Sequence, residues 1–287
     1  MVDAGESPLT LQEAADRLGV HYMTAYRYVR LGVLAAEKSG GTWRVAPGVV
    51  EAFVQARQAG PGDAAAAGRR GGRRAPWAER LEHRLLAGDA RGAWGVIEAA
   101  QAAGAEVDEV YLDLVAPAMV SIGRRWESGE LDVAVEHRAS VIAGRLVGRL
   151  GHRFLRRGRN RGTVVLGAPA GERHSLPLAL LADLLRGAGW DVSDLGSDVP
   201  APSFALAAAH AEQLTVVGVS ISTHESTRSA EATISALRGV VDGVPILVGG
   251  CAVRDGDHAR ELGADGWACD GRAVVALLED LAMGSRP

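Results

Sequence analysis

The sequence has only two cysteines, Cys251 and Cys269, and no Cys-x-x-Cys pair. This pattern indicates neither a disulfide framework nor a zinc site, and it suits a cytosolic protein. There is also no uninterrupted apolar run long enough to span a membrane, because charged residues or glycine interrupt the alanine-rich segments. We therefore expect a cytoplasmic protein that makes no contact with a membrane.

Other absences limit the function. The formal net charge is −4, which argues against a wholly basic nucleic-acid coat but allows a local basic patch. The opening residues, MVDAGESPLT, are polar and acidic, unlike a signal peptide. The sequence contains no recognisable Ser/His/Asp or Cys/His catalytic set, zinc-binding helix motif or phosphate-cradling loop. The chain is therefore not expected to be an enzyme, and its 287 residues suit two or three domains.

Residues 1–60 have the pattern of a winged helix-turn-helix domain. Thr10 and Glu13 have the spacing of a capping box, and apolar residues then recur at helical intervals. A second helical run covers 21–31, after a short glycine-containing turn. Two β-prone runs around Gly40-Gly41 predict a hairpin wing, and a third helix is expected after it.

The run LTLQEAADRLGVHYMTAYRYVRLGVL, with the later GGTWRV, resembles the winged-helix DNA-binding domain of MerR-type and excisionase-type proteins. The resemblance implies a double-stranded DNA operator as partner, with base edges and phosphates contacted by one helix and the wing. The charges of this segment nearly balance, so one copy would bind weakly and a homo-oligomer, a dimer or tetramer, is expected. The alternative is a small helical domain that binds protein. The candidate DNA-contacting residues are Tyr22, Thr24, Arg27 and Arg30 on the helix and Lys38 and Arg44 on the wing.

Residues 61–76 have the composition of a flexible linker rich in glycine and arginine. Two interpretations of its arginines stay open. They form a solubilising charge cluster, or they belong to a disordered arm that adds non-specific phosphate contacts. These arginines are Arg69, Arg70, Arg73 and Arg74.

Residues 77–160 predict a four-helix bundle, because four helical runs follow one another with glycine-containing breaks between them. Trp126 ends the third run, and Glu136 and His137 lie one to two turns into the fourth. Two adjacent helix ends could thus bring an indole, a carboxylate and an imidazole together, although a lone tryptophan is more often a packing residue. The four runs are Trp77–Leu86, Ala90–Ala103, Val107–Trp126 and Asp132–Leu155.

Residues 161–287 alternate between strand-like and helical runs, which predicts a doubly wound parallel sheet with a flavodoxin-like arrangement. Ligands of such folds bind at the carboxyl ends of the strands. His174, the Ser220–Thr223 segment and Gly249-Gly250 follow the first, third and fourth strand-like runs. We therefore expect them to meet at one edge of the sheet, where the flanking prolines and glycine hold His174 in a strand-to-helix loop.

Three segments at this edge resemble the cobalamin-binding motif D/E-x-H-x-x-G, S-x-L/T and Gly-Gly. The resemblance implies that His174 coordinates cobalt from below, that Glu172 orients the other ring nitrogen of His174, and that the glycines leave room for the benzimidazole tail. Pro177 stands where the family usually has glycine, which puts the local path of the loop in question. The implied cofactor-binding residues are Glu172, His174, Ser220, Ser222, Thr223, Gly249 and Gly250, with Ser220 expected to join the network around His174.

The spacing of Trp126, Glu136 and His137, W-x9-EH, resembles the helical cap of the CarH/LitR family of light-sensing, cobalamin-dependent MerR-type repressors. The resemblance implies that these residues cover the upper, 5′-deoxyadenosyl face of the cofactor. The family's best-known light-sensing members have histidine directly after this tryptophan, where this chain has Glu127. Carboxylate is a poorer ligand than imidazole for low-spin cobalt. The alternatives are a different upper ligand after illumination, a reversible photoresponse, or a protein that senses the cofactor and not light.

We thus expect a repressor that binds DNA as an oligomer while it holds adenosylcobalamin and that responds to photolysis of the cofactor. Two other functions stay open: a corrinoid carrier protein for methyl transfer, and a helix-turn-helix adaptor with a vestigial pocket. The expected architecture is multidomain, α and α/β: a winged helix-turn-helix, a four-helix bundle and a Rossmann-like cobalamin-binding domain.

Overall fold

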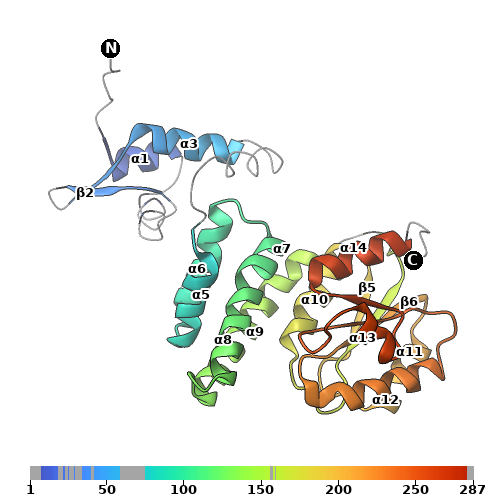
Figure 1. Cartoon of the computed structure of the whole chain (residues 1–287). Helices are drawn as coiled ribbons and strands as arrows, with labels where there is room; N and C mark the ends of the chain where they lie inside the picture. The colour runs from blue at the N-terminus through green and yellow to red at the C-terminus, as the bar shows by residue number, and fades with distance from the viewer. Residues whose placement is uncertain are drawn as a thin grey trace. The chain divides into compact units, whose positions relative to one another are not determined.

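The computed structural model of the chain describes residues 8–18, 22, 25, 29, 34–39, 42–58, 75–155, 158 and 160–282 (Figure 1). These residues belong to two compact units, 1–139 and 140–287. Most of the predicted second helix lies outside the described residues, and so do the predicted DNA contacts Thr24, Arg27 and Arg30. The four arginines of the 61–76 segment lie outside them as well. None of the described helices combines the length and the apolarity needed to cross a membrane.

The N-terminal domain has the predicted wing. Two short strands pair antiparallel around the third strand, in the order β1-β3-β2. The predicted capping box is present: the Thr10 amide donates to Glu13 Oε2 at 2.7 Å, and the Glu13 amide donates to Thr10 Oγ1 at 3.3 Å. Alanine and leucine side chains of α1 are buried in the core of this domain. Its elements are β1 (Leu9–Thr10), α1 (Leu11–Leu18), β2 (Glu37–Ser39), β3 (Thr42–Val45) and α3 (Pro47–Gln58).

The predicted run of four helices follows. Asp89 begins the second of them by accepting a hydrogen bond from the Gly92 amide, 2.8 Å away. Leucine and isoleucine side chains such as Leu81, Leu85 and Ile97 are fully buried. The helices are α5 (Trp77–Leu86), α6 (Ala90–Ala102), the composite third helix α7 (Val107–Glu109), η1 (Val110–Val115) and α8 (Ala116–Glu127), and α9 (Val133–Leu150), which continues into the 3₁₀ turn η2 (Gly151–Phe154).

The third helix differs from a plain α-helix in one respect. Its segment η1 is a π-helix, in which the Ala116 amide donates to the carbonyl of Tyr111, five residues earlier. Pro117 follows directly and has no amide hydrogen to continue the α-helical bonding pattern. The wider turn lets the helix continue past the proline to Glu127.

The C-terminal half is a parallel five-stranded sheet in the order β5-β4-β6-β7-β8. Renumbered within the domain, this order is 2-1-3-4-5, which is the flavodoxin-like order predicted from the sequence. Its strands are β4 (Thr163–Gly167), β5 (Asp191–Asp194), β6 (Leu214–Ser220), β7 (Ile246–Gly249) and β8 (Gly266–Ala268).

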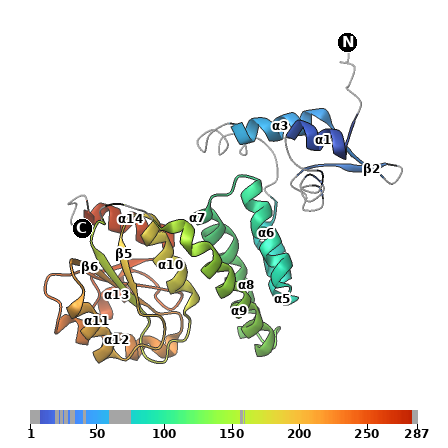
Figure 2. The same cartoon turned by 180° about the vertical axis from the view of Figure 1, so that it is seen from behind.

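Helices cover both faces of this sheet (Figures 1 and 2). On one face, α10 and α14 pack over a core that includes Val164, Leu178 and Leu278. On the other face, α11, α12 and α13 enclose a second core around Phe204 and Ile234. Burial on both faces explains why β4, β6 and β7 are almost continuously apolar, whereas the edge strand β5 has three polar residues. The helices are α10 (Leu176–Gly187), α11 (Ala201–His210), the short η3 (His224–Ser226), α12 (Thr227–Arg238), α13 (Gly256–Glu261) and α14 (Gly271–Ala282).

Candidate functional site

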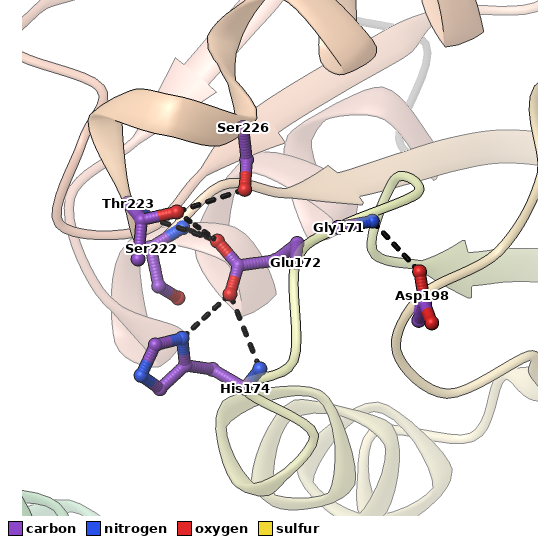
Figure 3. A network of polar contacts seen from close by, with 7 residues as sticks. All are labelled: Gly171, Glu172, His174, Asp198, Ser222, Thr223 and Ser226. Carbon is purple, nitrogen blue, oxygen red and sulfur yellow. Dashed lines mark hydrogen bonds and ion pairs between the residues drawn. The ribbon is translucent and has the colours of Figure 1, made fainter.

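The strand order places a switch point between β4 and β6, where the chain leaves the sheet in opposite directions. The loop after β4 carries Glu172 and His174, and the loop after β6 carries Ser222 and Thr223. The predicted residues of these two loops therefore meet at the carboxyl edge of the sheet. Figure 3 shows them around one carboxylate.

Glu172 lies at the centre of this group and is fully buried. Its Oε1 accepts a hydrogen bond from the His174 amide at 3.1 Å and lies 2.5 Å from Nδ1 of the His174 ring. Its Oε2 accepts from the amides of Ser222 at 2.7 Å and Thr223 at 2.9 Å. The His174 side chain, in contrast, is half exposed. The buried carboxylate thus joins the two loops and holds the imidazole at the surface.

These contacts decide the charge of the carboxylate. Burial by itself raises the pKa of Glu172. The hydrogen bonds from the ring and amide of His174 and from the Ser222 amide outweigh this effect and lower the pKa from 4.5 to about 2. Glu172 is therefore ionised at neutral pH and can only accept hydrogen bonds. Nδ1 of His174 must then be the donor, which leaves the lone pair of a neutral ring on Nε2, the form that binds a metal.

Asp198, which the sequence analysis did not single out, fixes the path of the β4 loop. Its Oδ1 accepts from the Gly171 amide at 2.7 Å, and its own amide donates to the Glu172 carbonyl at 2.8 Å. Asp198 adopts φ 59°, a left-handed conformation that aspartate tolerates better than most residues. Gly171 also has positive φ. No local pattern predicts a partner 27 residues away.

The hydroxyl groups near Glu172 differ from the expectation. Ser220, expected to join the network, ends β6 and pairs across the sheet with Gly249. Within the described part of the chain, no hydrogen bond joins its side chain to Glu172. Thr223 does so instead: Thr223 Oγ1 lies 3.3 Å from Glu172 Oε2 and 2.8 Å from the buried Ser226 Oγ. The chain has left the strand after Ser220, so the next amides and hydroxyl face the carboxylate.

Pro177 starts a helix and does not distort the loop. It occupies one of the first two positions of α10, with Ser175 as the preceding cap residue. A proline is well tolerated there, because the amide it lacks would have no partner within the helix. The helix begins at Leu176, directly before this proline. The departure from the glycine of the motif is thereby absorbed by α10.

Neighbouring backbone atoms limit the space at Gly249 and Gly250. Gly250 has φ 103°, and a Cβ built on it would lie 2.3 Å from the carbonyl oxygen of Ile221. A Cβ on Gly249 would lie 3.1 Å from the Ala268 carbonyl oxygen. The close approach of β6 and the turn after β7 therefore requires glycine at 250, apart from any ligand.

The predicted cap residues belong to α8 and α9. Trp126 is 43 % exposed, so it is not the core residue that a lone tryptophan usually is. His137 is exposed, and its Nδ1 lies 2.6 Å from Oε2 of the largely buried Glu136. Glu127, directly after Trp126, is exposed. The helix ends thus present an indole, a carboxylate and an imidazole, with five residues of connection between α8 and α9.

Three predicted DNA-contacting residues are described. Tyr22 is exposed. Lys38 and Arg44 lie on the paired strands β2 and β3 of the wing, and the Lys38 ammonium is 6.0 Å from the ring centroid of Trp43. One guanidinium nitrogen of Arg44 lies 3.4 Å from the Pro8 carbonyl oxygen. Both wing cations are thus exposed.

Three domain families match the chain. A helix-turn-helix domain matches residues 8–58, and two families described as B12 binding domains match residues 77–150 and 162–278. The helical run and the parallel sheet therefore both correspond to parts of cobalamin-binding proteins.

Individual relatives agree with these domains. The chain is 36 % identical over 148 residues to the HTH-type transcriptional repressor CarH of Myxococcus xanthus; the match covers 51 % of this chain and about half, 48 %, of CarH. It is 30 % identical over 168 residues to a corrinoid protein of Desulfitobacterium hafniense, covering 56 % of this chain and 76 % of that protein.

A solved structure shares the fold. The monomethylamine corrinoid protein of Methanosarcina barkeri superposes with a TM-score of 0.64 at 19 % identity, covering 71 % of this chain and 98 % of that one. The solved structure thus shares the fold of the helical run and the five-stranded sheet. The helix-turn-helix family matches the domain before them. The chain therefore belongs to the cobalamin-binding corrinoid proteins, and it carries a helix-turn-helix domain before its cobalamin-binding domains.

Proposed function

We propose that this protein is a transcriptional repressor that binds operator DNA as a homo-oligomer while it holds adenosylcobalamin, and that light is its signal. One observation carries the proposal: a half-exposed His174, held by a buried ionised carboxylate, occurs in the same chain as a winged helix-turn-helix. The first feature suits a metal ligand, and the second suits DNA.

The residues present fit a corrinoid. Nε2 of His174 is the ring nitrogen for cobalt, because Nδ1 donates to Glu172. Ser222 and Thr223 hold that carboxylate through their amides, so the lower ligand is fixed from two loops. Gly249 and Gly250 keep side chains away from the same edge, which suits a benzimidazole tail. When bound, adenosylcobalamin supplies a cobalt–carbon bond that visible light cleaves.

The upper group of the cofactor is assigned to the cap residues. An exposed indole on α8 offers a flat apolar surface for an adenosyl group, and Glu136 and His137 on α9 offer an acceptor and a ring nitrogen. We propose that Trp126, Glu136 and His137 contact that group. Release of the adenosyl group would then change the contacts of the helix ends. We propose that this change alters the oligomeric state and thereby the affinity for DNA.

A corrinoid carrier for methyl transfer is the second candidate, favoured by the match to a corrinoid protein over 76 % of its length. The helix-turn-helix match at residues 8–58 favours the regulator, because methyl transfer gives no reason for such a domain. On this view the protein catalyses no reaction of its own. A light-independent cobalamin sensor is the variant of the proposal that Glu127 suggests, because it replaces the family's histidine.

Spectra and DNA binding of the full chain test the proposal together. In the dark, the spectrum of bound adenosylcobalamin should show histidine in place of the cofactor's own benzimidazole. The loaded protein should also reduce the electrophoretic mobility of the DNA upstream of its gene. Illumination should abolish the shift. A shift that is insensitive to light would leave a cofactor sensor. If the protein binds the cofactor but does not change the mobility of the DNA, and if its bound corrinoid accepts and passes on a methyl group, the protein is the carrier.

A further inference from the structure

The connection between α8 and α9 is a closed turn with a defined geometry. Gly129 has φ 78°, its amide donates to the Trp126 carbonyl at 2.9 Å, and the Glu130 amide donates to the Arg125 carbonyl at 2.9 Å. This pair of bonds is the Schellman motif, in which a left-handed glycine ends a helix. Trp126 therefore lies in a helical turn whose end is fixed by its own backbone.

The side chain of Arg125 adds a second set of contacts to this turn. Its Nε and Nη2 lie 2.9 and 2.6 Å from Oε1 of Glu130, and its Nη1 lies 2.9 Å from Oε1 of Glu82 on α5. The Glu82 side chain is only 16 % exposed, and that of Arg125 is 34 % exposed. One guanidinium thus bridges the turn and a neighbouring helix of the same unit.

The chain beyond the turn is fixed in the same way. Asp132 begins α9 by accepting a hydrogen bond from the Ala134 amide at 2.8 Å, and its carbonyl accepts from the Glu136 amide at 3.2 Å. Glu136 and His137 follow within the first two turns of α9. Arg125 therefore holds the one segment that separates Trp126 from the Glu136-His137 pair.

We propose that Arg125 is a positioning residue for the cap: by bridging Glu82 and Glu130 it fixes the direction of the Trp126 indole, and so sets the preference for an adenosyl over a methyl upper group. This inference rests on the proposed role of Trp126. Arg125 touches no cofactor itself. Its effect is confined to the upper group, because none of its three contacts involves the loops that hold His174.

The bridge requires arginine. The guanidinium contacts Glu130 with one edge and Glu82 with another nitrogen, and the planar group presents both donors at once. A lysine ammonium at the end of a flexible stem is a point charge without this fork. Arg124, one residue earlier and exposed, has the same charge on the same turn and provides the matched control.

The experiment compares adenosylcobalamin with methylcobalamin, titrated in the dark into the full chain and its variants. Arg125→Met, Arg125→Lys and Glu82→Gln should lower the preference for adenosylcobalamin over methylcobalamin by roughly fivefold, the size of one partly exposed charged contact. Binding of methylcobalamin should be unchanged, which also shows that each variant is folded. Arg124→Met should keep the wild-type preference, and Trp126→Ala should lose it.

Each outcome decides the matter. An unchanged preference in Arg125→Met and Glu82→Gln, together with a lost preference in Trp126→Ala, would overturn the role of Arg125 and leave the cap intact. An equal loss of both cofactors would show a purely structural role and also overturn it. If Trp126→Ala keeps the preference, both the proposed cap and this inference are wrong. The role of His174 is tested separately, by the affinity for methylcobalamin.

Discussion

Nδ1 of His174 lies 2.5 Å from Oε1 of Glu172, and the carboxylate is fully buried while the imidazole is half exposed. The pair therefore combines a fixed charge inside the protein with a ring nitrogen at its surface. In metalloproteins, a carboxylate placed in this way orients the histidine that binds the metal.

Replacement of His174 is the first prediction. His174→Ala should abolish the dark spectrum of histidine-ligated cobalamin and reduce affinity by more than the roughly 10- to 100-fold that loss of a supporting group costs. The measurement is an absorbance titration with adenosylcobalamin. His224→Ala provides the control, because His224 is exposed and lies in η3 beside the same edge. Equal spectra for wild type and His174→Ala would refute the assignment of the lower ligand.

Glu172 predicts a dependence of stability on pH in the absence of cofactor. The folded pKa, about 2, lies below the unfolded value of 4.5, so the stabilisation is present above pH 4.5 and is lost as the pH falls towards 2. Its size is roughly 3 kcal/mol at neutral pH. Urea unfolding of wild type and Glu172→Gln should therefore differ most at pH 7 and converge between pH 4.5 and 2.

A surface carboxylate serves as the control for that comparison. Glu231→Gln on α12 removes an exposed charge and should leave the difference between pH 7 and pH 3 as in wild type. A gap between wild type and Glu172→Gln that stays constant down to pH 2 would contradict the depressed pKa.

The turn after β7 gives a prediction about backbone and sterics. Gly250→Ala would force a Cβ to within 2.3 Å of the Ile221 carbonyl oxygen at a positive φ, so we expect a loss of roughly 3 kcal/mol in the free energy of unfolding. Gly243 also has positive φ, 67°, but open space around it. Gly243→Ala should therefore cost about 1 kcal/mol, and chemical denaturation measures both. Equal costs would show that Ile221 yields.

Glu127 predicts a change in the illuminated spectrum. Glu127→His restores the imidazole that the family resemblance places directly after the cap tryptophan, and imidazole is a better ligand for cobalt than carboxylate. The illuminated holoprotein of this variant should show a bis-histidine spectrum that the wild type lacks. Asp108→His, which replaces an exposed carboxylate on α7 of the same unit, is the control and should behave like wild type. Identical spectra for wild type and Glu127→His would mean that the geometry of the cap differs from that of the family.

The sequence predicted the parallel sheet because strand-like and helical runs alternate strictly along residues 161–287. It also predicted the pairing of Glu172 with His174, which are two residues apart. Asp198 escaped prediction, since its partner Gly171 lies 27 residues away along the chain and only the folded loops bring the two together. Ser220 was assigned to the network because a motif gives positions and not the direction of a side chain at the end of a strand.

The π-helix at Val110–Val115 has a consequence for the evolution of the cap. Such a turn accommodates one residue more than an α-helical turn, and each residue rotates a helix by about 100°. Removing a single residue there would restore plain α-helical winding and leave every later side chain of α8, Trp126 included, at about the same angle around the helix axis. The π-turn thus absorbs a one-residue change of length and keeps the direction of the indole, whereas the same change in α8 between Pro117 and Trp126 would rotate the indole by about 100°.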